Sequence, residues 1–233
     1  MTQDLINQAS ISAPVSEKYP TYVAHLLVVD DIRNEPTNEF SDNYLANAEK
    51  FANDLLASVA IEDLPEVKIW REAFRSFGVK PSDSRSSFEA LLRRTSKGLP
   101  RIDFLTDVYN ALSVMHLLPI GGENFDKYQG APRLEIAIGD ETFDTTENGE
   151  AVIVNPMPGE VIWRDDLGVT CRRWNWRQCV RTRLSPDTKR ALFIFDGLGE
   201  DSIVKTGKCA AELTELIVNL WPGAEVRSRS ISA

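Results

Sequence analysis

Hydrophobic residues recur at two different spacings along the chain, and the change between them separates an early helical part from a late strand-rich part. The run Thr21 to Asp30 is apolar and β-branched, as expected of a strand. After it, apolar positions three and four residues apart predict amphipathic helices. These comprise a helix capped by Ser41 that extends to Val59, one over 67–77, one that begins near Ser86 with Glu89 at capping-box spacing, and one over 103–116.

Beyond Pro119 the pattern is that of short strands. Gly, Pro, Asn and Asp separate five apolar runs, over 133–139, 151–154, 160–165, 168–174 and 191–196. The residues Asp165 to Gly168 would join two of these runs in a hairpin. A helix over 203–220 and a final strand complete the order. Helices grouped early and strands grouped late predict an α+β fold with a mixed or antiparallel sheet, and a doubly wound fold is the alternative.

The composition is that of a globular protein. The chain has 233 residues, 42% of them hydrophobic, which is enough for one domain with a substantial core. Three cysteines without CxxC spacing argue against a disulfide framework and a zinc site. Met1 to Ala13 lacks the features of a secretion signal, and the sequence has no apolar run long enough for a membrane span. We therefore expect a cytoplasmic protein with no membrane partner.

Charge is distributed unevenly along the chain. The net charge of -9 argues against general electrostatic binding of nucleic acid, which depends on neutralising phosphates. However, the segments 71–101 and 172–190 contain eight and seven of the 26 Lys and Arg residues. If these segments share a face, they form a basic patch suited to a polyanion. The alternative is ordinary solvated surface.

Familiar catalytic motifs are incomplete in this sequence. His25 and His116 are its only histidines, which nearly excludes His-based triads and multi-histidine metal sites. Asp196 to Gly199 lacks the third glycine of a dinucleotide-binding turn. Cys171 or Cys179, beside arginines, could be a nucleophile, and a buried inert thiol is the alternative. We expect no metal and no cofactor.

Two segments have residue types typical of a binding site. In Leu118 to Asp126 (LPIGGENFD), paired glycines let the backbone approach a ligand, with polar side chains immediately after them. The alternative is a plain glycine turn. If Cys171 to Gln178 is extended, Arg173, Asn175 and Arg177 share one face, and arginine with tryptophan offers stacking surfaces and forks for an anion. The alternative is core tryptophans flanked by surface arginines.

These stretches carry a family resemblance. Asp107 to Asn110, LPIGGENFD, Leu134 to Phe143, GEVIWRDDLGVTCRRWNWRQ and Thr182 to Thr188 occur in an order that resembles the editing domain of the bacterial phenylalanyl-tRNA synthetase beta chain. The sequence looks closer still to free-standing relatives of that domain, in which FGVKPSDSRSSFEALLRR and CRRWNWRQ are the distinctive stretches. The likeness extends from about Val67 to Leu198.

The resemblance implies a three-layer sandwich of sheet, sheet and helix, within one domain over 1–233 that divides into portions 1–65, 66–200 and 201–233. It also implies a pocket that hydrolyses a wrong aminoacyl ester at the tRNA end. The matching positions are Asn110, Gly121 to Asp126 and the region around Arg173 to Arg177, with Thr182 nearby. This chain has Glu123 where the family has a histidine, and bulky residues replace the family's glycine-rich turn.

The resulting hypothesis is a trans-editing deacylase whose partner is the aminoacylated 3′ end of tRNA. Glu123 or Asp126 would orient a water molecule, Asn110 would stabilise the oxyanion, and Arg173 and Arg177 would hold phosphates or ribose. The other expected substrate-binding residues are Gly121, Gly122, Asn124, Trp174, Asn175 and Thr182. A tRNA- or amino-acid-binding module without chemistry is the alternative, and a small-molecule enzyme on the same fold is a third possibility.

Overall fold

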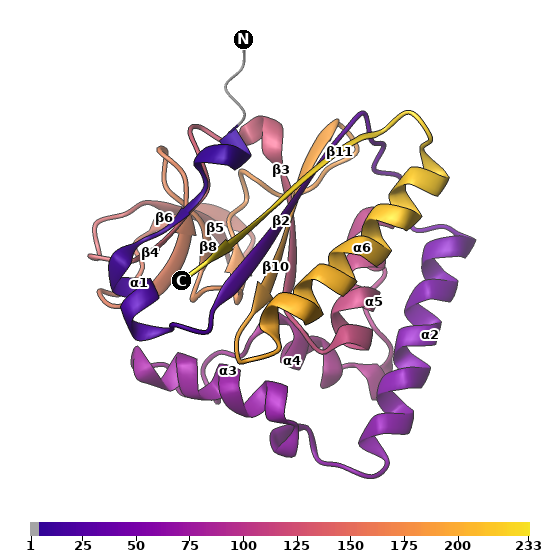
Figure 1. Ribbon diagram of the computed structural model, residues 1–233, viewed down its shortest axis with the longest axis horizontal. Helices are drawn as coiled ribbons and strands as arrows, with labels where there is room; N and C mark the ends of the chain where they lie inside the picture. The colour runs from indigo at the N-terminus through magenta and orange to yellow at the C-terminus, as the bar shows by residue number, and fades with distance from the viewer. Residues whose placement is uncertain (1–4) are drawn as a thin grey trace.

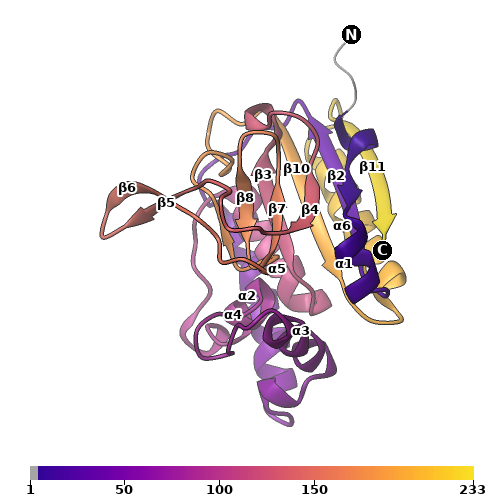
Figure 2. The same cartoon turned by 90° about the vertical axis from the view of Figure 1, so that its left-hand side faces the viewer.

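The computed structural model describes residues 5–233, and the first four residues of the polar leader lie outside the described residues. Its architecture is three layers, with two β-sheets packed against each other and helices on the outer face of one of them (Figures 1 and 2). One strand pair is parallel and the other pairs are antiparallel. The α+β prediction, with a mixed set of strands, is therefore confirmed.

The central layer is a four-stranded antiparallel sheet. Its strands, in spatial order, are β11 (Glu225–Ser232), β2 (Val23–Asp30), β10 (Arg190–Gly197) and β3 (Ile120–Asn124). Side chains alternate between its two faces, so Leu192 and Ile194 belong to one hydrophobic core while Phe193 and Phe195 belong to another. Both faces of β2 and β10 are therefore buried, which explains why these two strands are apolar almost throughout.

Helices cover one face of the central sheet. The helices α5 (Phe104–His116) and α6 (Ser202–Leu220) pack on β3, β2 and β10, and α2 (Glu39–Leu56) packs outside α5 (Figure 1). The apolar stripes of α5 and α6 meet Phe193 and Phe195 in one continuous core, whereas Leu45, Ala48 and Ala52 of α2 belong to the other core. Three shorter helices, α1 (Ala13–Lys18), α3 (Pro65–Ser76) and α4 (Ser87–Leu92), surround the other core.

A five-stranded sheet forms the third layer. Its spatial order is β1 (Ser10–Ile11), β4 (Arg133–Ile136), β7 (Val161–Arg164), β8 (Val169–Arg172) and β9 (Arg177–Gln178). The strand β1 runs parallel to β4. The hairpin of β5 (Phe143–Glu147) and β6 (Glu150–Val154) projects away from the body of the molecule (Figure 2). Four 3-10 turns, Leu5–Gln8, Ile61–Asp63, Thr95–Lys97 and Phe125–Lys127, complete the elements.

Most predicted elements are present, and the hairpin turn at Asp165 to Gly168 is confirmed. Two predictions about the binding segments are wrong. The glycine segment is the strand β3 and not a loop. The extended run from Cys171 to Gln178 is interrupted, because Arg173 and Trp174 adopt left-handed conformations with φ of 47° and 66° and turn the chain from β8 into β9.

Two predicted helix caps also differ from the structure. The helix α2 begins with Asn38 as its cap, three residues before Ser41, and Ser41 closes the capping box instead. At α4, Ser86 is the cap residue but its side chain makes no capping hydrogen bond. Glu89, which has capping-box spacing, instead pairs with Arg71 at 2.7 Å. None of the helices within residues 5–233 has the length and apolar character needed to cross a membrane.

Candidate functional site

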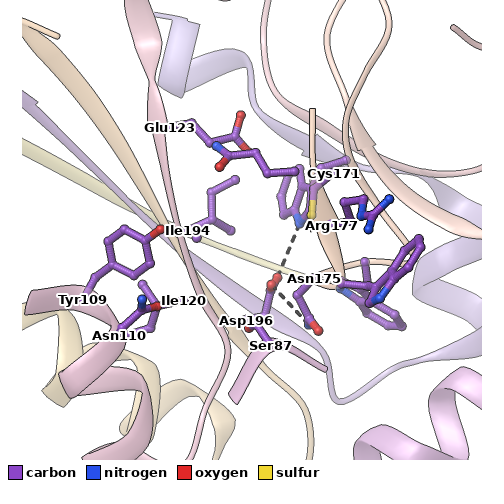
Figure 3. Close-up of a pocket in the computed structure, with 15 residues that line it drawn as sticks. Ser87, Tyr109, Asn110, Ile120, Glu123, Cys171, Asn175, Arg177, Ile194 and Asp196 are labelled. Carbon is purple, nitrogen blue, oxygen red and sulfur yellow. Dashed lines mark hydrogen bonds between the residues drawn. The ribbon is translucent and has the colours of Figure 1, made fainter. Parts of the chain in front are cut away.

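A cavity of about 140 Å³ lies between the two sheets, where the central sheet ends at β3 (Figure 3). A cavity of about 150 Å³ is large enough for benzene, so this one suits a group as small as an amino acid. Residues from both sheets, α4, α5 and the turn between β8 and β9 line it: Ser87, Tyr109, Asn110, Ile120, Gly121, Glu123, Trp163, Cys171, Trp174, Asn175, Trp176, Arg177, Gln178, Ile194 and Asp196.

The paired glycines contribute to the cavity in different ways, because they project to opposite faces of β3. Gly121 lines the cavity, and a methyl group added there would meet no atom within 4 Å. A methyl group added to Gly122 would lie 2.6 Å from the ring of Tyr109. Gly121 therefore leaves open space for a ligand, whereas Gly122 lets α5 pack closely against the strand.

The turn between β8 and β9 is fixed by the ring of Trp174. This ring is fully buried and makes edge contacts with Tyr19, Tyr22 and Trp70 at centroid distances of 4.7, 4.9 and 5.1 Å. The Trp174 amide also donates a hydrogen bond to the carbonyl of Val161 at 2.6 Å. These contacts stabilise the left-handed backbone of the turn. They hold the next residues of the chain against the cavity.

Glu123 is a buried carboxyl at one end of the cavity (Figure 3). Its side chain is 3% exposed and accepts a hydrogen bond of 2.7 Å from the Tyr128 hydroxyl. Burial raises its pKa from 4.5 to about 7, and hydrogen bonding from Tyr128 and Thr182 opposes this rise. A carboxyl with this pKa can both accept and return a proton near neutral pH.

Asp196 is a second buried carboxyl, at the other end of the cavity (Figure 3). It is 2% exposed, and its hydrogen-bond donors are Tyr22 at 2.5 Å and Trp163 and Asn175 at 3.4 Å each. Burial raises its pKa from 3.8 to about 7. Within residues 5–233, no Lys, Arg or His side chain forms an ion pair with it.

The residues considered as nucleophiles are not activated. Burial, together with the carboxylates of Glu123 and Asp196, raises the pKa of the Cys171 thiol well above its usual value. Burial also raises the pKa of Cys179, to about 12. Neither thiol is thus a thiolate at neutral pH. His25 and His116 bond to Ser230 and Glu212 respectively, and neither histidine lines the cavity.

Arg173, in the turn, and Arg177, at the start of β9, differ in whether an acidic side chain already neutralises their charge. Arg173 pairs with buried Glu160 and donates a hydrogen bond to the Ser84 hydroxyl. Arg177 is exposed, and its guanidinium lies 4.9 Å from the ring centre of Trp176. No acidic side chain in the described part of the chain forms an ion pair with Arg177. Arg177 is therefore the cation of this turn that is available to an anionic ligand.

The two basic segments adjoin where Arg173 contacts Ser84, beside the cavity. Part of their charge is neutralised internally. Glu89 is 1% exposed and accepts ion pairs from three arginines of the first segment, at 2.7 Å from Arg71, 3.5 Å from Arg85 and 3.0 Å from Arg93. The predicted patch is therefore smaller than the count of basic residues suggests.

Six of the eleven expected site residues line the cavity: Asn110, Gly121, Glu123, Trp174, Asn175 and Arg177. The carboxamide of Asn110 makes no hydrogen bond to any other described residue. The other five, Gly122, Asn124, Asp126, Arg173 and Thr182, do not line it. Asp126 has a 46% exposed side chain, 3.9 Å from Arg190, while Thr182 lies behind Glu123.

Several lining residues were not expected from the sequence. Asp196 ends an otherwise apolar strand, and this isolated carboxyl was the signal that a buried acid faces the cavity. Tyr109 precedes Asn110 in the DVYN stretch, which belongs to the family resemblance, but its close packing against Gly122 is visible only in the structure. Ser87 and Trp163 lie in two of the stretches that carry the family resemblance, but no role was assigned to either residue. In the part of the chain that is described, no cluster of three or more His, Cys, Asp or Glu side chains could hold a metal ion.

Comparison with known proteins gives one family match. The model of the B3/4 domain family matches residues 69–215, more than half of the chain. Among solved structures, the chain is similar to an N-terminal fragment of the phenylalanyl-tRNA synthetase beta-subunit from Pyrococcus horikoshii, with 12% identity and a TM-score of 0.44. The alignment covers 97% of this chain and 54% of that fragment, so the chain spans about half its length. No curated protein matches the chain.

Proposed function

The chain belongs to the B3/4 domain family, and from this premise we propose that it binds the aminoacylated 3′ end of tRNA and hydrolyses mischarged aminoacyl esters in trans. The observation that supports the proposal best is the cavity itself. It brings a buried carboxyl with a pKa near neutrality, Glu123, together with the free carboxamide of Asn110. The unpaired Arg177 lies at its rim.

The proposed reaction needs no nucleophilic side chain. Glu123 accepts a proton from a water molecule, whose oxygen attacks the carbonyl carbon of the ester. Asn110 donates a hydrogen bond to the developing oxyanion. The bond from the acyl carbon to the ribose oxygen then breaks, and the protonated Glu123 returns its proton to that oxygen. The products are a free amino acid and tRNA with its terminal hydroxyl restored.

Fewer residues take part in the proposed reaction than the sequence suggests. Glu123 takes the role of base, because Asp126 lies outside the cavity with an exposed side chain. Arg177 takes the role of phosphate contact, because Arg173 is already paired with Glu160. Thr182 positions Glu123 and does not contact the substrate in this proposal. The cavity volume of about 140 Å³ fits the aminoacyl group, and the rest of the tRNA would extend past the rim.

A panel of mischarged tRNAs tests the activity. Release of labelled amino acid is measured with the native protein, Glu123→Gln, Asn110→Ala and Glu141→Gln. We expect Glu123→Gln to slow release by about 10²- to 10⁴-fold, as for loss of a general base. Asn110→Ala should slow it by about 10²- to 10³-fold. Glu141 is 6% exposed and bonds to backbone amides outside the cavity, so its variant should retain activity.

Two results contradict the deacylase proposal. One is release by the native protein no faster than in buffer for every tRNA tested. The other is equal release by the native protein and Glu123→Gln. Tight tRNA binding without release would identify a binding module instead. Affinity for tRNA should fall steeply with salt, because phosphate contacts release counterions. Affinity for a free amino acid should change little.

A further inference from the structure

The cavity has a cluster of hydrogen-bond acceptors at the end opposite Glu123, formed by Asp196, Asn175 and Ser87 (Figure 3). We propose that this acceptor cluster is a subsite for a primary ammonium group. The inference deepens the proposed function and rests on it for the identity of the ligand, which would be the free α-amino group of an aminoacyl ester. A substrate with a blocked amino group would then be excluded.

Asp196 supplies the negative charge of the subsite. Its carboxyl is 2% exposed, and its donors are the neutral side chains of Tyr22, Trp163 and Asn175. In the described residues it has no cationic partner. A buried carboxylate without a counter-charge is costly to the folded protein. A ligand cation beside it would offset that cost, so this end of the cavity is electrostatically suited to one.

Two further acceptors in the cluster lack partners. Asn175 is 8% exposed and lines the cavity, and its Oδ1 is buried without a hydrogen bond. The Oγ of Ser87, on α4, is also buried and unpaired. Buried polar atoms in native proteins are nearly always satisfied, so these two oxygens, together with the unpaired Nε1 of the lining residue Trp174, indicate that the cavity holds a polar ligand. A primary ammonium group has three N–H donors and no acceptor, which matches one carboxylate, one carbonyl and one hydroxyl.

The end of the cavity beside Glu123 differs, because the positive charge of Arg181 already acts on Glu123, and among the described residues no buried side-chain oxygen beside it lacks a hydrogen bond. A cation with three donors is therefore better satisfied beside Asp196 than beside Glu123.

The test compares ligands that differ only at the amine. Amides of L-alanine, L-leucine, L-phenylalanine and L-tyrosine are titrated at neutral pH and at up to millimolar concentration. Their N-acetyl and des-amino counterparts are titrated in the same way. Binding is followed by calorimetry and by tryptophan fluorescence, to which the three lining tryptophans contribute. Amides are used because they separate binding from ester cleavage. At least one free amine should bind roughly 10- to 100-fold more tightly than both of its counterparts, as expected for loss of a charge-assisted hydrogen bond.

Three variants locate the subsite. In Asp196→Asn, which is nearly isosteric, the preference for the free amine should fall close to one. In Ser87→Ala it should fall roughly two- to tenfold, as for one neutral hydrogen bond. Glu123→Gln removes the other carboxyl of the same cavity and should retain the preference. Circular dichroism identifies any variant that does not fold. If Asp196→Asn fails to fold, the preference for the free amine in Ser87→Ala decides whether the subsite exists.

Equal binding of free and blocked amines, or no binding of any amide, overturns the inference. Loss of the preference in Glu123→Gln and its retention in Asp196→Asn also overturns it. These outcomes are independent of the tRNA assay. Amine-selective binding without ester cleavage would leave the subsite intact and reject the deacylase. Cleavage with equal binding of blocked amines would reject the subsite alone.

Discussion

Replacing the buried carboxyl of Glu123 with the neutral amide of glutamine should stabilise the folded protein, and the stabilisation should increase with pH. Burial raises the pKa of Glu123 from 4.5 to about 7, so the folded state binds this proton more tightly than the unfolded state. A raised pKa contributes stability that is fully present below about pH 4.5 and is lost as the pH rises through about 7. Glutamine cannot ionise and does not lose that contribution.

The magnitude follows from the difference between the two pKa values. Each pH unit corresponds to about 1.4 kcal/mol, so the rise from 4.5 to about 7 gives a ceiling of about 3 kcal/mol. Roughly 2 to 3 kcal/mol of this is lost between about pH 5 and pH 8. Glutamine keeps an oxygen that can accept the hydrogen bond from Tyr128. Asp196, whose pKa is also about 7, remains in the variant and preserves part of the pH dependence.

Urea unfolding at about pH 5 and about pH 8 measures this effect. At each pH, the free energy of unfolding of the native protein is subtracted from that of the variant. The two differences are then compared, because packing costs that do not depend on pH cancel in this comparison. Glu141→Gln is the matched control. Burial alone would raise the pKa of Glu141, but hydrogen bonds from backbone amides lower it overall. Glu141 is therefore largely ionised in both the folded and the unfolded protein over this pH range. The change in stability caused by Glu141→Gln should thus be nearly the same at both pH values. A Glu123→Gln effect that is constant or decreases as the pH rises would refute the reasoning.

Three further predictions follow from the cavity. The methyl group of Gly121→Ala enters open space in the cavity, so this variant should bind amino-acid amides more weakly while its urea midpoint stays nearly unchanged. Gly122→Ala should lower the free energy of unfolding by about 1 to 3 kcal/mol, because its methyl group overpacks against Tyr109. Deacylation should rise with pH and level off above about 7 as Glu123 ionises, and the rise should be absent from the residual rate of Glu123→Gln. Arg177→Ala should reduce the salt dependence of tRNA binding by about one phosphate contact. Arg173→Ala should reduce it less and lower stability more, because Arg173 pairs with Glu160.

The helices and strands of the fold were accessible from the sequence because periodicity reports burial directly, whereas the three-layer arrangement was implied by the family resemblance. The strands β2 and β10 are apolar on both faces, and both faces are buried. The strand β3 was missed for the opposite reason. Its glycines lack side chains, and the segment therefore has the composition of a loop. Only the tertiary structure shows that Gly122 is small because Tyr109 packs on it.

The candidate site was predictable only in part. The residues of the LPIGGENFD and CRRWNWRQ segments were correctly expected to be close together, since both line one cavity. Alternation along an assumed strand placed Asn175 and Arg173 on the same face, but the left-handed turn at Arg173 and Trp174 separates their environments. Such backbone conformations are uncommon for residues other than glycine. They depend on packing around Trp174 by residues distant in sequence, including Tyr22 and Trp70.

The arrangement of charge explains how an acidic protein can suit an anionic partner. The cavity has a carboxyl at each end, Asp196 and Glu123, together with the uncharged Asn110 and the exposed cation of Arg177. An aminoacyl ester on tRNA carries the matching series of groups, namely an ammonium, a carbonyl and phosphates. Hydrolysis changes one member of this series, because the neutral ester becomes a carboxylate beside Glu123. Like charges in a site of low dielectric repel strongly. In the proposed reaction, ionised Glu123 therefore favours the ester over the free amino acid and promotes release of the product.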